Sequence, residues 1–324
     1  LVNKKMKKKN YTNIAVIRDD RLGDVILTLP IMKKLKDELP NSKLTIIISS
    51  ISKNLIQMFD FIDDFIISDN SISTINTINS RKFDLILNFS PLKSKSYKYF
   101  LKANRKVNII YTSRYKKNFS KNKIKLFFLN FFFDSNYLNK RNSFVNLTHQ
   151  TIYMNQILKL ERISSLKKPK KVYLKLKNNL KYDCLIHLSN RWINSDYIIN
   201  DLILLVEDIS KRFKKISFTT DMLISDNIKK VIQALKSNKN YNINMQPNFK
   251  SWINLIDQSK LIITPECGCS HICGLLNKNA IIIYDRNNKP DFIKREYHPY
   301  LSKSIIKINS ALGNNQNKKI LSYI

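Results

Sequence analysis

Three of the chain's four cysteines and one of its four histidines lie in a single stretch, TPECGCSHICG, at residues 264 to 274. Their spacing, C-x-C-x-H-x-C, differs from the C-x-x-C knuckles and the helical His pairs that usually bind zinc. On a helix, His271 and Cys273 are two residues apart and point in different directions. The other chemistry open to this stretch is anion binding by backbone N–H groups. Gly268 in a tight turn, before a helix beginning near Ser270, presents such groups to a phosphate. We therefore favour a phosphate-binding loop whose cysteines are small packing residues, and a metal site is the alternative.

A second candidate site lies near the amino-terminal end, in RDDRLGDVILTLP at residues 18 to 30. Gly23 and Asp24 stand where the chain leaves a strand and enters a helix expected to begin near Val25, and open α/β sheets bind ligands at such strand ends. Asp24 either caps the helix or acts as a general base that removes a proton from a substrate hydroxyl. Three charged residues crowd the same turn, as a solvated ion-pair cluster or as ligand-orienting groups: Arg18, Asp20 and Arg21.

Strands must carry both sites, and the chain supplies short runs rich in Ile, Leu and Val that alternate with helix-like segments. Near-continuous apolar runs are typical of strands buried on both faces of a parallel sheet. The expected strands are residues 13–18, 43–49, 83–90, 182–189, 214–220, 260–265 and 280–285. The expected helices include residues 25–39, 198–213 and 226–236. This βαβ alternation occurs twice, which indicates an α/β fold with two parallel sheets.

A stretch rich in Lys and Pro, residues 164 to 179, separates the two alternations and suits a surface connection. We therefore divide the chain near residue 168 into a first domain, residues 1–168, and a second domain, residues 169–324. The last helix of the second domain could return to pack on the first. A chain of 324 residues is long enough to bury two cores of this size. Residues 92–146 show no regular pattern.

Charge indicates an anionic partner, because 57 Lys and Arg stand against 24 Asp and Glu, a formal net charge of +33. Nucleic acid, an anionic membrane surface and phosphorylated small molecules all fit. The sequence has no paired C-x-x-C finger and no aromatic RNP-like strand, so we expect no nucleic-acid partner. Four cysteines in so long a chain indicate a reducing compartment. The basic start lacks the apolar stretch of a signal peptide, and we expect a cytoplasmic protein.

Two separated stretches resemble the signatures of one family. IRDDRLGDVILTLPIMKKLKDELPNSKLTII resembles the amino-terminal signature of the ADP-heptose:lipopolysaccharide heptosyltransferases, glycosyltransferase family 9. LIITPECGCSHICGLLNKNAIIIYD resembles their carboxy-terminal signature, and the order and separation of the two motifs match the family. The resemblance covers most of the chain and is weak between residues 92 and 180. It implies a GT-B fold, with two Rossmann-like domains facing a central cleft. It also implies an inverting sugar transfer that uses no metal or other cofactor.

The resemblance also implies roles for individual residues. Asp24 matches the proposed catalytic base, and the first domain would hold the acceptor. Beside the acceptor or sugar lie Arg18, Asp20, Arg21 and Gly23. The second domain would bind the nucleotide sugar through Ser189, Asn190, Arg191, Asp221, Glu266, Cys267, Gly268, Ser270 and His271.

Three positions depart from the family pattern. Glu266 stands where the family has Asp, and Cys267 where it has Thr or Ser. The lysine that the family usually has near the donor diphosphate is either replaced by Arg191 or absent. A different sugar donor or a weakened activity therefore stays open.

The partners implied are an ADP-sugar donor and an anionic glycolipid of the lipopolysaccharide core or lipid A type, at the inner face of the cytoplasmic membrane. A peripheral membrane location would use the lysines and the apolar run IKLFFLNFFF at residues 124 to 133. That run is about half the ~20 residues of a spanning helix, and a helix packed into the first domain explains it equally well. The alternative functions are transfer from another nucleotide sugar, a non-catalytic nucleotide-sugar-binding scaffold, and a nucleic-acid-binding module.

Overall fold

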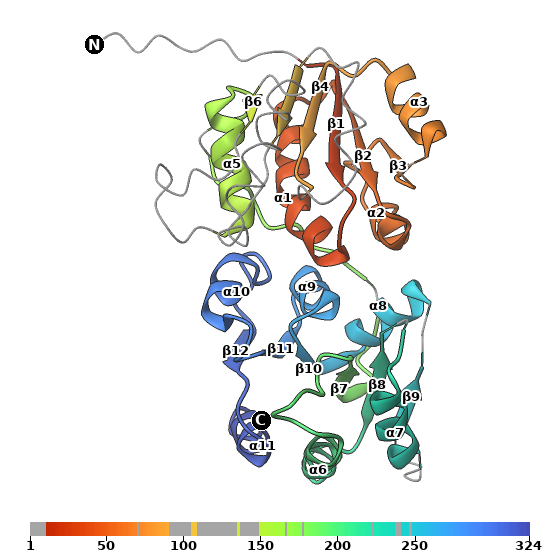
Figure 1. The fold of residues 1–324 in the computed structure, drawn as a ribbon, viewed down its shortest axis with the longest axis vertical. Coiled ribbons are helices and arrows are strands. Elements are labelled where there is room, and N and C mark those ends of the chain that lie inside the picture. Colours follow the sequence, from red (N-terminus) through yellow and green to blue (C-terminus); the bar gives the residue numbers. More distant parts are fainter. Residues whose placement is uncertain are drawn as a thin grey trace, which may run out of the picture. The chain divides into compact units, whose positions relative to one another are not determined.

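The computed structural model describes residues 11–69, 71–90, 105–108, 135–136, 149–165, 167–176, 178–221, 223–236, 241–245 and 248–324. The chain divides into two compact units, Leu1–Val172 and Tyr173–Ile324. Each unit is built on a parallel sheet with helices packed against it (Figure 1). The apolar run at residues 124 to 133 lies outside the described residues. Among the described helices, none combines the length and the apolarity that crossing a bilayer requires.

The first sheet has six strands in the described part of the chain, in the order β3-β2-β1-β4-β5-β6. Its strands are β1 (Asn13–Arg18), β2 (Lys43–Ile48), β3 (Asp64–Ile67), β4 (Leu85–Asn88), β5 (Arg105–Asn108) and β6 (Ser135–Asn136). Its helices are α1 (Leu22–Glu38), the 3-10 turn η1 (Ser50–Ser52), α2 (Lys53–Ile56), α3 (Ile72–Ser80) and α5 (Gln150–Leu160). Every adjacent pair of strands is parallel, and β1 has β2 on one side and β4 on the other. This is the doubly wound order of Rossmann folds, and the strand order reverses between β1 and β4.

The second sheet repeats the arrangement, in the order β12-β11-β10-β7-β8-β9. Its strands are β7 (Tyr182–Leu188), β8 (Ile216–Thr220), β9 (Tyr241–Asn244), β10 (Ser259–Pro265), β11 (Asn279–Tyr284) and β12 (Ile305–Asn309). Its helices are α6 (Ile199–Ser210), α7 (Asp226–Leu235), α8 (Phe249–Asp257), α9 (Gly268–Leu275), α10 (Pro290–Glu296) and α11 (Asn314–Leu321). Here the order reverses between β7 and β10. The two Rossmann-like parallel sheets expected from the sequence are thus confirmed.

The strands predicted from apolar runs all form: β1, β2, β4, β7, β8, β10 and β11. The sequence analysis missed shorter or more polar strands nearer the sheet edges, such as β3, β9 and β12. The sequence analysis predicted the starts of two helices a few residues too late. α1 begins at Leu22, before the expected start near Val25, and α9 begins at Gly268, before Ser270. The connections are short, residues 19–21 before α1 and 266–267 before α9, and each ends in an extended residue, Arg21 or Cys267.

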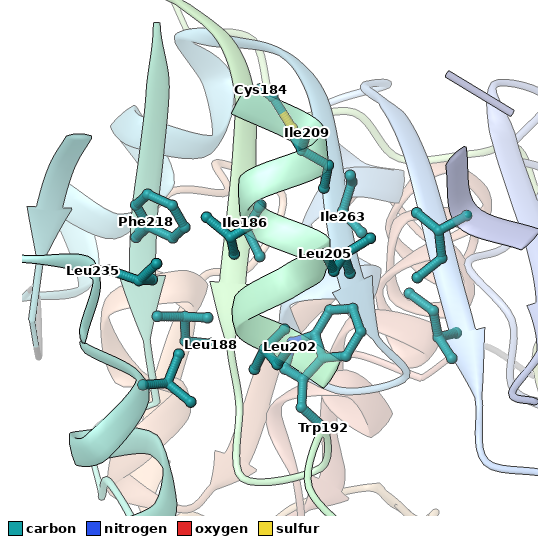
Figure 2. Close-up of a cluster of buried hydrophobic side chains, with 14 of the residues drawn as sticks. Cys184, Ile186, Leu188, Trp192, Leu202, Leu205, Ile209, Phe218, Leu235 and Ile263 are labelled. Carbon is teal, nitrogen blue, oxygen red and sulfur yellow. The ribbon is translucent and has the colours of Figure 1, made fainter. Parts of the chain in front are cut away.

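The core of the second unit shows why its elements adopt this order. One cluster of buried side chains lies between the sheet and helices α6, α7 and α11, and includes Leu202 and Leu205 of α6, Phe218 of β8 and Ile320 of α11. Figure 2 shows Leu202 and Leu205 beside Trp192, which follows β7. The last helix, α11, packs against α6 within this unit. Helices α8, α9 and α10 lie on the opposite side of the sheet (Figure 1). With both faces covered, the strands need apolar residues on both faces.

Helix α9 approaches the segment after α10 very closely. A Cβ on Gly274 would lie 2.6 Å from the Cβ of Pro299 and 3.0 Å from the Ser302 hydroxyl. Only glycine allows this approach, which fixes the helix that carries the cysteine-rich stretch.

A buried lysine joins α1 to α5 and to the end of the first unit. The ammonium group of Lys34 donates to Asn155 Oδ1, to the Ser165 carbonyl and to the Lys167 carbonyl. Glu38, one turn along α1, lies 3.8 Å from Lys34 and accepts from the Ser165 N–H and hydroxyl. All three ammonium protons therefore have acceptors, as burial of a charged group requires.

Lys34→Met should lower the free energy of unfolding by about 2–4 kcal/mol, because it leaves the three buried oxygen acceptors without their donor and removes the positive charge beside Glu38. The neighbouring pair Lys33–Asp37 has the same spacing on α1 but is exposed, so Lys33→Met should cost less than about 1 kcal/mol. Guanidinium denaturation followed by circular dichroism measures both changes, and amide exchange assigns them to α1 and α5. Equal losses in the two variants would contradict the structural role of Lys34.

Candidate functional site

The candidate residues of the first unit follow β1, at the point where the strand order reverses. Arg18 ends β1 and is 4% exposed. Its guanidinium donates to the Phe89 carbonyl beyond β4 and to Gln150 of α5, and forms ion pairs with Asp20 at 3.1 Å and Asp24 at 2.8 Å. Arg18 therefore holds the two carboxylates rather than a ligand.

Asp24 lies in the first turn of α1, and its carboxylate meets Arg18. The N-cap residue of α1, Arg21, makes no side-chain cap, and Asp24 is the acidic residue of the first turn, where a negative charge favours the helix start. Burial raises the pKa of Asp20 to about 8, with the Arg18 charge opposing and the Asp24 charge adding to the rise. The raised pKa favours the neutral form of Asp20, and Asp24 makes the shorter contact with the Arg18 guanidinium, at 2.8 Å. Gly23 is part-exposed next to them, and Arg21 is exposed at the helix start.

In the second unit the turn after β7 fixes Arg191. Trp192 is buried, and its indole N–H donates to the His187 carbonyl at 2.7 Å. The Ser189 hydroxyl accepts from the Arg191 N–H at 3.3 Å. The Arg191 side chain then reaches across the reversal point and donates from Nη1 to both the carbonyl and the carboxylate of Glu266. Glu266 directly follows β10, so this contact joins the ends of the two strands that flank the reversal.

The amino-terminal end of α9 lies in the same place. Cys267 occupies the cap position, yet no side chain there accepts a hydrogen bond from the helix. The neighbouring helices α7 and α8 are capped by Ser225 and Asn248. The first N–H groups of α9, beginning at Gly268, are therefore left for another acceptor, and such an end attracts anions.

Two other residues predicted to bind the nucleotide sugar have side chains that form hydrogen bonds within the protein. The Ser270 hydroxyl donates to the Cys267 carbonyl at 2.6 Å and is fully buried. The Asn190 side chain donates to the Leu223 carbonyl at 2.9 Å and accepts from the Ser225 N–H at 2.8 Å. These side chains shape the loops after β8 and β10.

His271 is also buried, and it lies near a histidine that the sequence analysis did not select. Burial lowers the pKa of His298 to about 4, and the charges of Lys307 and His271 contribute. His298 is therefore neutral at physiological pH.

The structure adds one residue that the sequence analysis did not select, His187 at the carboxyl end of β7. Its ring is 1% exposed and lies between Thr219 Oγ1, 3.0 Å from Nδ1, and Asp221 Oδ1, 3.2 Å from Nε2. Burial opposes the positive charge of His187, but the hydrogen bond to the Asp221 carboxylate raises the pKa of His187 above its ordinary value. Asp221 also accepts from the Asn190 N–H at 3.2 Å, and its pKa is lowered: burial opposes the shift, and the bond to His187 drives it. A single histidine inside an apolar strand gave no pattern by which to find it.

The three clustered cysteines are buried free thiols. Burial raises the pKa of Cys269, and Cys273 adds to the rise, so this sulfur stays protonated. Among the described residues, no group of three or more His, Cys, Asp or Glu side chains is placed to hold a metal ion. The cysteines therefore pack the loop in the structure.

No protein-family model and no curated protein sequence matches the chain. Solved structures do match. A glycosyl transferase family 9 protein from Veillonella parvula superposes with a TM-score of 0.70 at 18% identity, over 98% of this chain and 92% of that one. E. coli heptosyltransferase WaaC with ADP gives 0.74 at 11% identity, over 96% and 99%. E. coli ADP-heptose lps heptosyltransferase II gives 0.68 at 13% identity, over 92% and 90%. The resemblance inferred from the two motifs is thus confirmed at the level of fold.

His187→Gln should destabilise the second unit in a pH-dependent way. Because the pKa of His187 is raised in the folded chain, its stabilising contribution is present in full below the unfolded pKa of about 6.5 and is lost as the pH rises through the raised value. We expect the free energy of unfolding of the variant to be about 1–3 kcal/mol lower than that of the wild type at low pH, and the difference to become smaller at high pH. Urea unfolding followed by the fluorescence of Trp192 and Trp252, both in the second unit, measures it. Asp221→Asn should weaken the same pH dependence. A constant deficit at every pH would mean that His187 is neutral.

Proposed function

We propose that the protein is an inverting glycosyltransferase that moves a heptose or related sugar from an ADP-sugar to a hydroxyl of an anionic glycolipid of the lipopolysaccharide core or lipid A type. One observation carries the proposal. At the reversal point of the second sheet, Arg191 and the uncapped amino-terminal end of α9 come together beside Glu266. They form an anion site in a fold whose solved counterparts include heptosyltransferases.

The second unit would bind the donor. The N–H groups that begin α9 at Gly268 and the guanidinium of Arg191 suit a diphosphate, because both supply hydrogen-bond donors with positive charge. Asp221 is 36% exposed, and His187 keeps its carboxylate ionised. A fixed carboxylate beside a nucleotide site is an acceptor for the ribose or the base of adenosine. Under this proposal no metal is needed, because the protein itself neutralises the diphosphate.

The first unit would supply the base. Asp24 removes the proton of the acceptor hydroxyl as that oxygen attacks the anomeric carbon on the face opposite the nucleotide. The transition state resembles an oxocarbenium ion, and the nucleoside diphosphate leaves. Arg18 acts on Asp24 as a positioning residue, since its buried guanidinium orients the carboxylate. Exposed Arg21 is the group of this cluster suited to meet an anionic acceptor.

An acceptor of this kind gives the net charge of +33 a purpose, because lysines attract anionic headgroups. A peripheral position on the inner membrane face follows from the proposal. Glu266 and Cys267 are the residues that favour the second candidate, a transferase of a different nucleotide sugar, because both depart from the usual donor loop.

Calorimetric titration with ADP, GDP, UDP and CMP tests the donor. We expect ADP to bind at least about tenfold more tightly than the other nucleotides, a difference of about 1.4 kcal/mol. Preference for UDP or GDP would indicate the second candidate. If no nucleotide binds, the transferase proposal fails. Steeply salt-dependent binding to any DNA or RNA would then support a nucleic-acid-binding module.

Asp24→Asn tests the base. Turnover of ADP-heptose with a lipopolysaccharide-core acceptor should fall by about 10²-fold or more, the scale for loss of a general base, while ADP affinity stays unchanged. Asp37→Asn changes an exposed carboxylate of the same helix and should leave both quantities unchanged. Loss of affinity and turnover together would assign Asp24 a structural role.

A further inference from the structure

Arg191 and Glu266 are joined more closely than two separate donor ligands would be. They come from different strand ends, after β7 and after β10, and the contact between them spans the reversal point. Nη1 of Arg191 donates to the Glu266 carbonyl and to its carboxylate Oε2. The Glu266 N–H is itself bonded to the Ile283 carbonyl of β11 at 2.8 Å, so the partner of Arg191 is anchored to the sheet.

This contact uses only part of the guanidinium. Arginine has five N–H donors in a rigid plane, and two of them belong to Nη1. Among the described residues, none accepts from Nε or Nη2 of Arg191, and the side chain is 45% exposed. Buried Trp192 and the Ser189 hydroxyl fix the backbone on either side. The free Nε–Nη2 edge is therefore presented to solvent in one orientation, beside the amino-terminal end of α9.

The contact depends on the chemistry of both side chains. A lysine at position 191 carries its three N–H donors on one atom and cannot hold Glu266 and offer a planar two-donor edge at once. An aspartate at position 266 is one methylene shorter, which withdraws its carboxylate from the guanidinium. Arginine at position 191 and glutamate at position 266 therefore suit each other.

We propose that Arg191 and Glu266 act as one coupled pair in donor binding: Glu266 fixes Nη1, and the Nε–Nη2 edge of Arg191 binds the diphosphate of the nucleotide sugar. The inference rests on the proposed function and assigns the binding of its diphosphate to the pair. Two parallel N–H donors pair with two phosphate oxygens at once, which gives a charge-assisted contact of fixed geometry. Glu266 serves here as a positioning residue, and Arg191 as the ligand.

A double-mutant cycle tests the coupling. ADP affinity is measured by calorimetry for the wild type, Arg191→Lys, Glu266→Asp and the double variant. We expect each single change to weaken ADP binding about tenfold, and the double change to weaken it about tenfold as well, since contacting residues are not additive. Independent residues would instead give about a hundredfold loss in the double variant, which would overturn the proposal.

A second ion pair on the same two strands provides the control. Asp183 of β7 and Lys260 of β10 pair at 2.8 Å near the amino-terminal ends of these strands. Asp183→Asn should leave ADP affinity unchanged. A loss equal to that of Glu266→Asp would show a general effect on the sheet and would overturn the specific role.

Two further measurements separate this inference from the proposed function. Pyrophosphate replaces ADP as a probe of the diphosphate alone, and amide exchange of residues 266–271 reports the pair without any ligand. If pyrophosphate binds and no nucleotide does, the donor proposal fails, and the cycle is measured with pyrophosphate. Arg191→Lys should speed exchange in residues 266–271. If the exchange does not change, the proposed coupling of Arg191 and Glu266 is wrong. The same holds if the wild type binds neither ADP nor pyrophosphate.

Discussion

A guanidinium spans the reversal point of each sheet, and the geometry of both candidate sites depends on it. In a doubly wound sheet the chain crosses over in opposite directions on the two sides of the reversal. The loops that follow the two central strands therefore diverge, and a crevice with polar backbone groups opens between them. Arg18 joins β1 to the carbonyl of Phe89 beyond β4, and Arg191 joins β7 to Glu266 beyond β10. A rigid planar cation with five donors can bond several groups at once across such a gap.

The two arginines differ in burial, and the difference separates their roles. Arg18 is enclosed, and its partners are Phe89, Gln150, Asp20 and Asp24. A buried guanidinium needs all of these partners, since an unpaired charge would be costly there. Arg191 is half-exposed, and part of its donor set is open to solvent. The first arginine therefore organises carboxylates, and the second is available to an anionic ligand.

A buried histidine also organises the second site. His187 lies beneath the loops that follow β8 and β10, with Thr219 Oγ1 3.0 Å from Nδ1 and Asp221 Oδ1 3.2 Å from Nε2. Asp221 in turn accepts from the Asn190 backbone, which ties the turn after β7 to the loop after β8. Charge-assisted bonds of this kind hold loops more firmly than neutral ones, because the ionised partners attract each other in surroundings of low dielectric. The carboxylate that faces solvent is thereby fixed in position and kept ionised.

The sequence by itself determined the architecture, because strands buried on both faces must be apolar along their length, and such runs stand out. The edge strand β9 (YNIN) was not predicted, because its two asparagines interrupt the apolar run. The sequence also located the candidate sites, since the ligand edge of a parallel sheet lies where strands end. The sequence could not show that Arg18 is buried and Arg191 is partly exposed, and it did not identify His187. Whether a charged side chain is enclosed, and what it meets, depends on strands and helices far away in the chain, and only the tertiary structure brings these together.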